Sequence, residues 1–199
     1  MDWNTAKDTE IPKTVGNYMK FDQGANKFRI LSEPIMGWEY WTEAKGKEKG
    51  KPVRSTERPS VIPLDADLRN GWNPRYFWAF VVWNLDAKKL QILEITQSTI
   101  LTPLQQLVQN EDWGDPRKYS ITINRKGEGL DSEYNLTPSP AKETSKEIVA
   151  QYENAGIRLE LLYEGKDPFD TKAESAPKED FPAEYKSGTD VPNPDDISF

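Results

Sequence analysis

The stretch Arg75-Tyr-Phe-Trp-Ala-Phe-Val-Val-Trp83 decides the fold of this chain of 199 residues. Its aromatic and β-branched residues are those that strands favour, and neither proline nor glycine interrupts them, so the stretch predicts a β-strand. Successive side chains of a strand point to opposite faces, and here both sets are apolar. One set must therefore be largely exposed or covered by another element, and the sequence does not say which.

The flanking segments extend this strand into a sheet. The apolar segment 28–41 predicts one long, bent strand, because Pro34 cannot donate to a sheet ladder and Gly37 suits a bulge. After residue 83 the sequence predicts a paired strand at 90–96, a helix at 99–108, and strands at 119–124 and 133–137. A long bent first strand and a helix between the third and fourth strands describe a mainly β protein with a five-stranded OB-fold barrel, although other β-rich folds share this order.

Composition divides the chain into four parts. They are an N-terminal arm (1–25), the predicted OB-fold domain (26–140), a C-terminal helical extension (141–164) and a disordered acidic tail (165–199). In the extension, Thr144 and Glu147 have the spacing of a capping box, and Gly156 is placed to end the helix. In the tail, nine acidic residues outnumber four lysines and apolar clusters vanish.

The net charge of −7 is unevenly placed along the chain. Residues 1–140 carry 19 basic and 19 acidic residues, so residues 141–199 hold the whole excess. Within the first part, residues 42–60 form a predicted loop region with six Lys or Arg against three Glu. Because the chain has no cysteine and no histidine, thiolate or imidazole metal sites and His-based catalysis are excluded, and we expect no cofactor. No segment is apolar enough to cross a bilayer and no signal peptide is recognised, so we expect a soluble intracellular protein without a membrane partner.

Aromatic residues beside basic ones are the positive functional signal. Unpaired nucleic acid requires this combination, since bases stack on flat rings and Lys or Arg neutralise the phosphates. The candidate DNA-binding residues are Trp38, Tyr40, Trp41, Lys45, Lys47, Lys49, Lys51, Arg54, Arg75, Tyr76, Phe77, Trp78, Trp83, Arg117, Lys118 and Arg125. Two alternatives stay open: the tryptophans fill the barrel interior, or the rings stack on sugars in a carbohydrate-binding β-domain. A catalytic function is least favoured, because no activated nucleophile or tuned base is recognisable.

Three stretches resemble the single-stranded DNA-binding proteins of bacteriophages. They are residues 26–32 (NKFRILS) leading to 38–41 (WEYW), residues 76–83 (YFWAFVVW) with 90–97 (LQILEITQ), and residues 112–116 (DWGDP) through 121–129 (ITINRKGEG). The resemblance implies a non-enzymatic protein that coats single strands during phage DNA replication, recombination or repair in the cytoplasm of the infected bacterial host. Some phage members carry a cysteine and histidine zinc site, which this chain lacks.

The last residues resemble the acidic tip of bacterial single-stranded DNA-binding proteins. The residues that carry this likeness are Asp195, Asp196, Ile197 and Phe199, with Ser198 where proline usually precedes the final phenylalanine. The resemblance implies that the tip binds replication or recombination proteins. Because the tail is acidic and tethered, we also expect it to compete with DNA for the basic groove.

Overall fold

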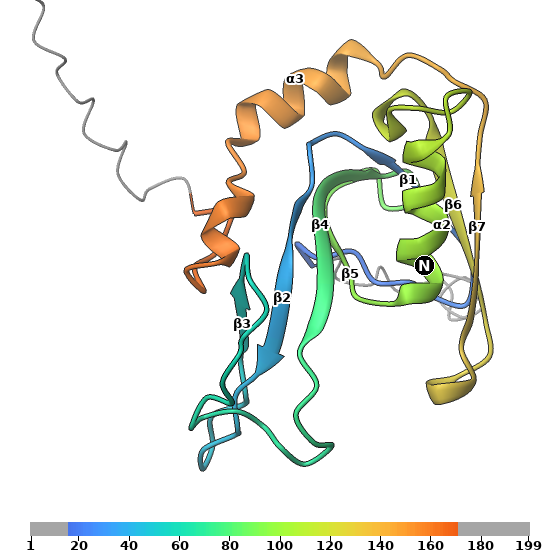
Figure 1. The fold of residues 1–199 in the computed structure, drawn as a ribbon. Coiled ribbons are helices and arrows are strands. Elements are labelled where there is room, and N and C mark those ends of the chain that lie inside the picture. The colour runs from blue at the N-terminus through green and yellow to red at the C-terminus, as the bar shows by residue number, and fades with distance from the viewer. Residues whose placement is uncertain (1–15, 171–199) are drawn as a thin grey trace, which may run out of the picture.

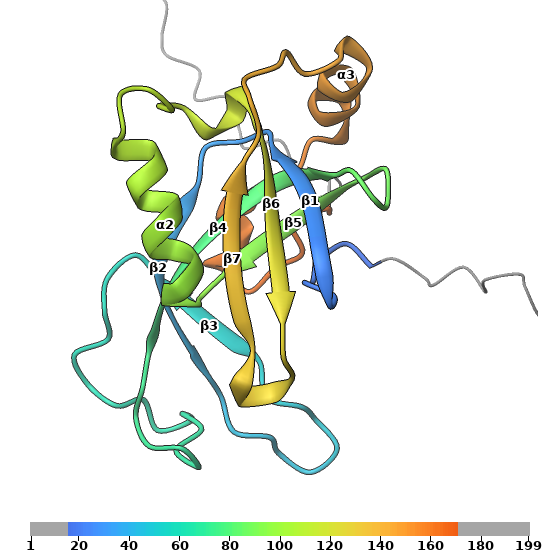
Figure 2. The same cartoon turned by 90° about the vertical axis from the view of Figure 1, so that its right-hand side faces the viewer.

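The computed structural model describes residues 16–170, which form one strongly bent antiparallel sheet with two helices (Figures 1 and 2). The strands are β1 (Gly24–Ile30), β2 (Ile35–Trp41), β3 (Pro52–Ser55), β4 (Arg75–Asn84), β5 (Lys89–Ile95), β6 (Ser120–Lys126) and β7 (Glu133–Pro138). The α-helices are α2 (Ser98–Gln109) and α3 (Lys146–Ala155), and three short 3-10 turns are η1 (Pro116–Lys118), η2 (Gly129–Asp131) and η3 (Leu159–Leu162). The predicted acidic tail begins at residue 165, but residues 165–170 are described, and Phe169 packs against the cluster that includes Leu159 and Leu162. The rest of the predicted tail, including its tip, lies outside the described residues.

β4 is the central strand, as its sequence predicts. β5 pairs with one edge of it, while β2 and β1 lie one after the other along the opposite edge. The single bent strand predicted for 28–41 is therefore two strands, separated where Pro34 interrupts the ladder. Leu31 still donates from its backbone N–H to the carbonyl of Val81 over 2.9 Å, so the bend remains attached to β4.

The predicted five-stranded barrel is wrong, because the sheet stays open. Its strand order is β3-β2-β4-β1-β6-β7 with β5 on the other side of β4, and β5 does not pair with β7. The segment before β1 lies along the free edge of β5. The backbone N–H of Met19 donates to the carbonyl of Ile92 in β5, and the N–H of Ile92 donates to the carbonyl of Asn17, both over 2.8 Å. Helix α2 packs against β7. β3 is an additional strand within the predicted loop.

From Phe77 onward both faces of β4 pack against other elements, which answers for this part of the strand the question that its sequence leaves open. The even-numbered side chains from Phe80 onward pack with α2 through Ile100 and Leu104. The odd-numbered side chains from Phe77 to Val81 pack under η3, against Leu159 and Leu162. The C-terminal extension therefore seals one face of the sheet, and Figure 1 shows it lying on the side of β4 away from α2.

The predicted helices are confirmed, with changes at their ends. Pro103 lies inside α2, although its position suggested the first turn. α3 begins after Ser145, whose side chain accepts from the backbone N–H of Ile148, one residue later than the predicted cap. Gly156 ends it with a φ of 58°, which glycine adopts without strain. Within the described part of the chain, no helix has the length and apolar character that a bilayer crossing requires.

Candidate nucleic-acid interface

Five partly exposed rings form a band on one face of β2 and β4 and in the loop between β3 and β4. This aromatic band consists of Trp38, Tyr40, Trp72, Tyr76 and Trp78. Trp38 lies directly opposite Tyr76 in the ladder, and their ring centroids are 5.3 Å apart. Tyr40 follows on the same face and contacts the ring of Trp72 at 5.5 Å. Alternation along the strand therefore brings the rings together on the face that η3 does not cover.

One ring of this band and one cation beside it were not among the candidates from the sequence. Trp72 follows Gly71 in an irregular loop, where no periodicity indicates its direction. Arg58 was counted in the basic loop but not among the site residues, and its guanidinium carbon lies 5.1 Å from the ring centre of Trp38. A cation over a ring face is attracted to it, and the same guanidinium can also bind a phosphate beside a stacked base.

The band borders two shallow hollows. The first has a volume of about 590 Å³ and is lined by Tyr40 and Trp72 together with the cations Lys49, Arg69 and Arg75. The second, of about 400 Å³, runs past Tyr76 and Trp78 to the side of α2. Because Arg75 lines both hollows, they form neighbouring sections of one surface.

The lysines of the β2–β3 loop stand at one end of this surface. Lys45, Lys47 and Lys49 are exposed, and the tight turn between them needs Gly46 with its φ of 61°. A Cβ on Gly50 would lie 2.1 Å from the carbonyl oxygen of Thr42, so glycine is also required where the two sides of the loop meet. Figures 1 and 2 show this loop, the β3–β4 loop and the β6–β7 hairpin directed toward the same end of the molecule.

Arg54 does not belong to this surface, which corrects the prediction that it contacts phosphate. Its side chain is 8% exposed and forms ion pairs with Glu94 over 2.7 Å and with Glu39 over 3.7 Å. Its guanidinium also lies 5.7 Å from the ring centre of Phe77, on the covered face of the sheet. Lys51 points to the same side, where it lines a hollow with Arg54 and Asp167.

The buried carboxyl of Glu39 is the centre of this polar cluster. Burial raises its pKa to about 7, and the neighbouring carboxyl of Glu94 acts in the same direction, while Arg54 and Arg75 oppose the rise. Arg75 donates to Glu39 over 3.0 Å from a side chain that is 48% exposed. Arg75 thus connects the buried cluster to the open hollows and can still meet a ligand there.

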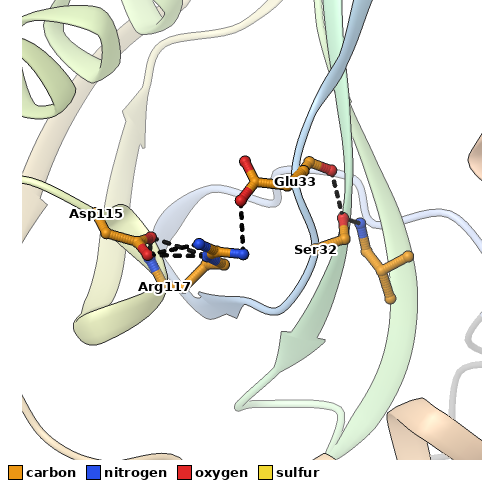
Figure 3. A network of polar contacts seen from close by, with 5 residues as sticks. Ser32, Glu33, Asp115 and Arg117 are labelled. Carbon is orange, nitrogen blue, oxygen red and sulfur yellow. Dashed lines mark hydrogen bonds and ion pairs between the residues drawn. The ribbon is translucent and has the colours of Figure 1, made fainter. Parts of the chain in front are cut away.

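Three other basic candidates lie away from the band, and two of them are held by other partners. Arg117 pairs with Asp115 and with Glu33, each over 2.7 Å, as Figure 3 shows. Lys118 is exposed beside it, but both belong to η1, which lies at the end of the molecule opposite to the lysine loop (Figure 2). Arg125 donates to the carbonyl of Phe21 over 2.8 Å and to the Ser132 hydroxyl over 3.2 Å, so it holds the β6–β7 hairpin to the N-terminal segment.

The remaining aromatic candidates are separated from the band. Phe77 is 0% exposed and lies under η3, so no base can stack on it. Trp83 is 9% exposed and lies near the far end of β4, opposite Arg29. Trp41 is 45% exposed at the end of β2, and it lines hollows on both faces of the sheet.

Acidic side chains near the surface do not form a metal site. Asp67 is held by Arg69 through hydrogen bonds of 2.6 to 3.1 Å, which lower the pKa of its carboxyl to about 2. Across residues 16–170, no group of three or more acidic side chains is arranged to hold a metal ion. The chemistry that the described surface offers is therefore stacking and charge neutralisation.

Comparison with known proteins gives a similarity that agrees with this chemistry. The chain is similar to a protein of Escherichia phage T5 described as a probable ssDNA-binding protein, with 25% identity over 139 residues. The match covers 60% of this chain, which spans about half (53%) of the relative's length. No protein-family model matches the chain. No solved structure matches it either.

Proposed function

We propose that this protein binds single-stranded DNA along the aromatic band, without sequence preference and without catalysing a reaction. The observation that carries the proposal is the band itself, in which five neighbouring rings on β2, β4 and the β3–β4 loop stay partly exposed beside two hollows. Every base has a flat face, so each stacked base adds about 1–3 kcal/mol whatever its identity. The T5 relative, described as a probable ssDNA-binding protein, supports the same class of binding protein.

Phosphates of the strand bind to cations on both sides of the rings. Lys45, Lys47 and Lys49 extend from one side, while Arg58 and Arg75 lie against the band. The protein as a whole is acidic, so attraction depends on this local concentration of positive charge. Binding should therefore weaken steeply as salt rises, because each neutralised phosphate releases counterions.

The strand order supports an arrangement like that of an OB-fold, in which the sheet does not close into a barrel. The β1–β2 ribbon, β4, β5, α2, β6 and β7 follow one another as the strands and helix of an OB-fold do. The closing contact between β5 and β7 is replaced by the segment that carries Met19. In this proposal the loops that bind DNA are β2–β3, β3–β4 and β6–β7, which gather at one end of the sheet.

The phage relative supports the biological setting that we propose. We place the protein in the cytoplasm of an infected bacterium, where it coats strands exposed during DNA replication, recombination or repair. Its acidic tail, with Asp195, Asp196, Ile197 and Phe199 at the tip, recruits replication or recombination proteins and competes with DNA for the cations of the band. Deleting residues 171–199 should then raise DNA affinity most at low salt.

Tryptophan fluorescence during a titration with unlabelled oligo(dT) tests the proposal directly. Stacking should quench the fluorescence, and oligo(dT) and oligo(dC) should bind with similar affinity that falls as salt rises. The same titration with a neutral polysaccharide is the control. Quenching by the polysaccharide alone would favour a carbohydrate-binding domain, and no response to either polymer would reject stacking on the band.

A further inference from the structure

A separate hollow of about 590 Å³ lies between β1 and the segment that leads from β7 into α3. Lys27, Arg29 and Trp83 line it from the sheet, and Lys142 and Ser145 line it from the segment before α3. Figures 1 and 2 show α3 at the end of the molecule opposite to the lysine loop. The hollow is therefore distinct from the aromatic band, with which it shares no lining residue.

Arg29 is the unusual member of this lining. It is only 6% exposed, yet none of the ion pairs within residues 16–170 includes it. Its Nη1 donates to the carbonyl of Arg117 over 2.9 Å, which uses one of its five donors. Burial lowers the pKa of Arg29 below its usual value. A buried charge without a counter-ion is costly, so an anion bound beside it would be strongly favoured.

The buried Arg54 provides the internal comparison. Both side chains belong to strands of the sheet and are less than a tenth exposed, but Arg54 is neutralised by Glu39 and Glu94 while Arg29 has no such partner. The chain therefore supplies carboxylates to one buried guanidinium and leaves the other facing a hollow.

Other groups around Arg29 add to the positive charge. Lys27 lies two residues earlier on the same face of β1, and Lys142 approaches from the other side. The hydroxyl oxygen of Ser145 accepts from the N–H of Ile148 over 3.4 Å, which leaves its O–H to donate. Glu143 is the single acidic residue of the lining, so the lining carries a net charge of two positive.

The rest of the lining is partly apolar, with Ser120, Ser139 and Thr144 as further polar residues. Trp83, Leu85, Pro140 and Ile148 supply the apolar part, next to the cations. A hollow of this size with a few convergent polar groups fits a small organic anion better than an isolated ion. We propose that it binds the phosphate group of a nucleotide, with Arg29 and Lys142 at the phosphate and the apolar wall against the sugar and base.

The nucleotide can be free or part of a DNA strand, and the proposal does not rest on the aromatic band. The test is a titration of the full chain with dTMP, observed through the indole N–H resonances of the ¹⁵N-labelled protein. The resonance of Trp83, assigned with a Trp83→Phe variant, should shift with dTMP and inorganic phosphate but not with thymidine. An equal shift with thymidine, or no shift with dTMP, would overturn the proposal.

Two variants and a control attribute the binding to this hollow. Lys142 is exposed, so Lys142→Gln should fold normally and weaken dTMP binding by about threefold. Arg29→Gln should weaken it by about tenfold or more, because it removes the buried charged donor. Lys126→Gln, at the opposite end of the sheet, should leave the affinity unchanged. Equal dTMP affinity in Lys142→Gln and Lys126→Gln would contradict the assignment.

Competition identifies the source of the phosphate. Displacement of dTMP by oligo(dT) would indicate a second contact with the strand, and its absence would indicate a free nucleotide; both agree with the proposal. A peptide of residues 190–199 that shifts the Trp83 resonance, in a protein that does not respond to phosphate, would instead assign the hollow to the chain's own tail. Loss of the dTMP effect with normal oligo(dT) quenching would reject this inference and leave the proposed function intact.

Discussion

The two faces of the β2–β4 region are built from similar side chains but differ in how much of them is exposed. One face carries Phe77, Ala79 and Val81 and is sealed by η3, with its charged groups neutralised beneath. The other carries Trp38, Tyr40 and Tyr76, which remain partly exposed beside two hollows. The difference arises from the covering elements, because η3 buries Phe77, Ala79 and Val81, whereas α2 leaves a hollow beside Tyr76 and Trp78.

This comparison teaches that aromatic content alone does not distinguish a core from a binding surface. On the sealed face the rings should contribute to stability, and on the open face they should contribute to DNA affinity. Substitutions on the two faces can break or sharpen this distinction.

The largest effect is expected at Phe77, on the sealed face. Phe77→Ala should lower the free energy of unfolding by about 3–5 kcal/mol, because it removes a fully buried ring and leaves a cavity beneath η3. Urea denaturation followed by circular dichroism measures this. The oligo(dT) affinity of the folded fraction should stay unchanged, and a selective loss of affinity without a loss of stability would break the comparison.

The next effect concerns pH and the carboxyl of Glu39. Its pKa is raised from 4.5 to about 7, so the folded protein retains this proton over a range in which the unfolded chain has released it. The free energy of unfolding should therefore decrease by up to about 3 kcal/mol as the pH rises through that range. Urea denaturation at about pH 5 and about pH 8 checks the slope.

Two variants isolate Glu39 from other groups. Glu39→Gln should remove most of this pH dependence, because the amide does not titrate. Glu133→Gln, an exposed carboxyl on β7, is the control and should retain the slope. The same slope in both variants would assign the titration to a different group.

Strand and helix positions could be predicted from the sequence, since they depend on local patterns. Two strand predictions are confirmed: β4 from the run Tyr76 to Trp83, and β6 from the alternation at Ile121 and Ile123. β3 was missed, because Lys51 to Ser55 is short and lacks apolar alternation, and its pairing with β2 depends on the close approach allowed by Gly37. A Cβ on Gly37 would lie 2.2 Å from the carbonyl oxygen of Ser55.

Barrel closure and the composition of the site depend on long-range contacts, which explains why these predictions were less successful. Closure is prevented by the segment around Met19, which has too few residues to give a periodic signal. Arg54 was taken as a phosphate contact because its sequence neighbours are basic, but pairing across the sheet places it against Glu39 and Glu94. Trp72 was missed because a loop residue has no register that would indicate Tyr40 as its partner.

A smaller effect is expected at Trp72, on the open face. Trp72→Ala should weaken oligo(dT) binding by about tenfold, within the range of about 1–3 kcal/mol for one stacking platform. Trp113→Ala is the matched control, because Trp113 is also half-buried and contacts a tyrosine ring, that of Tyr119, at 5.3 Å. Fluorescence anisotropy of labelled oligo(dT) measures both affinities. Equal losses in the two variants would show that the effect comes from the fold and not from stacking.

The smallest effect is expected from the lysines beside the band and is seen best in the salt dependence. Lys47→Gln combined with Lys49→Gln should reduce the slope of log affinity against log salt by about 1.4, since each phosphate contact on a single strand contributes about 0.7. Lys88→Gln combined with Lys146→Gln removes the same charge from exposed positions away from the band and should leave the slope unchanged. If both pairs lower the slope equally, DNA responds to the net charge of the protein and not to a groove beside the rings. A reduction confined to the first pair would locate the phosphate path on the open face.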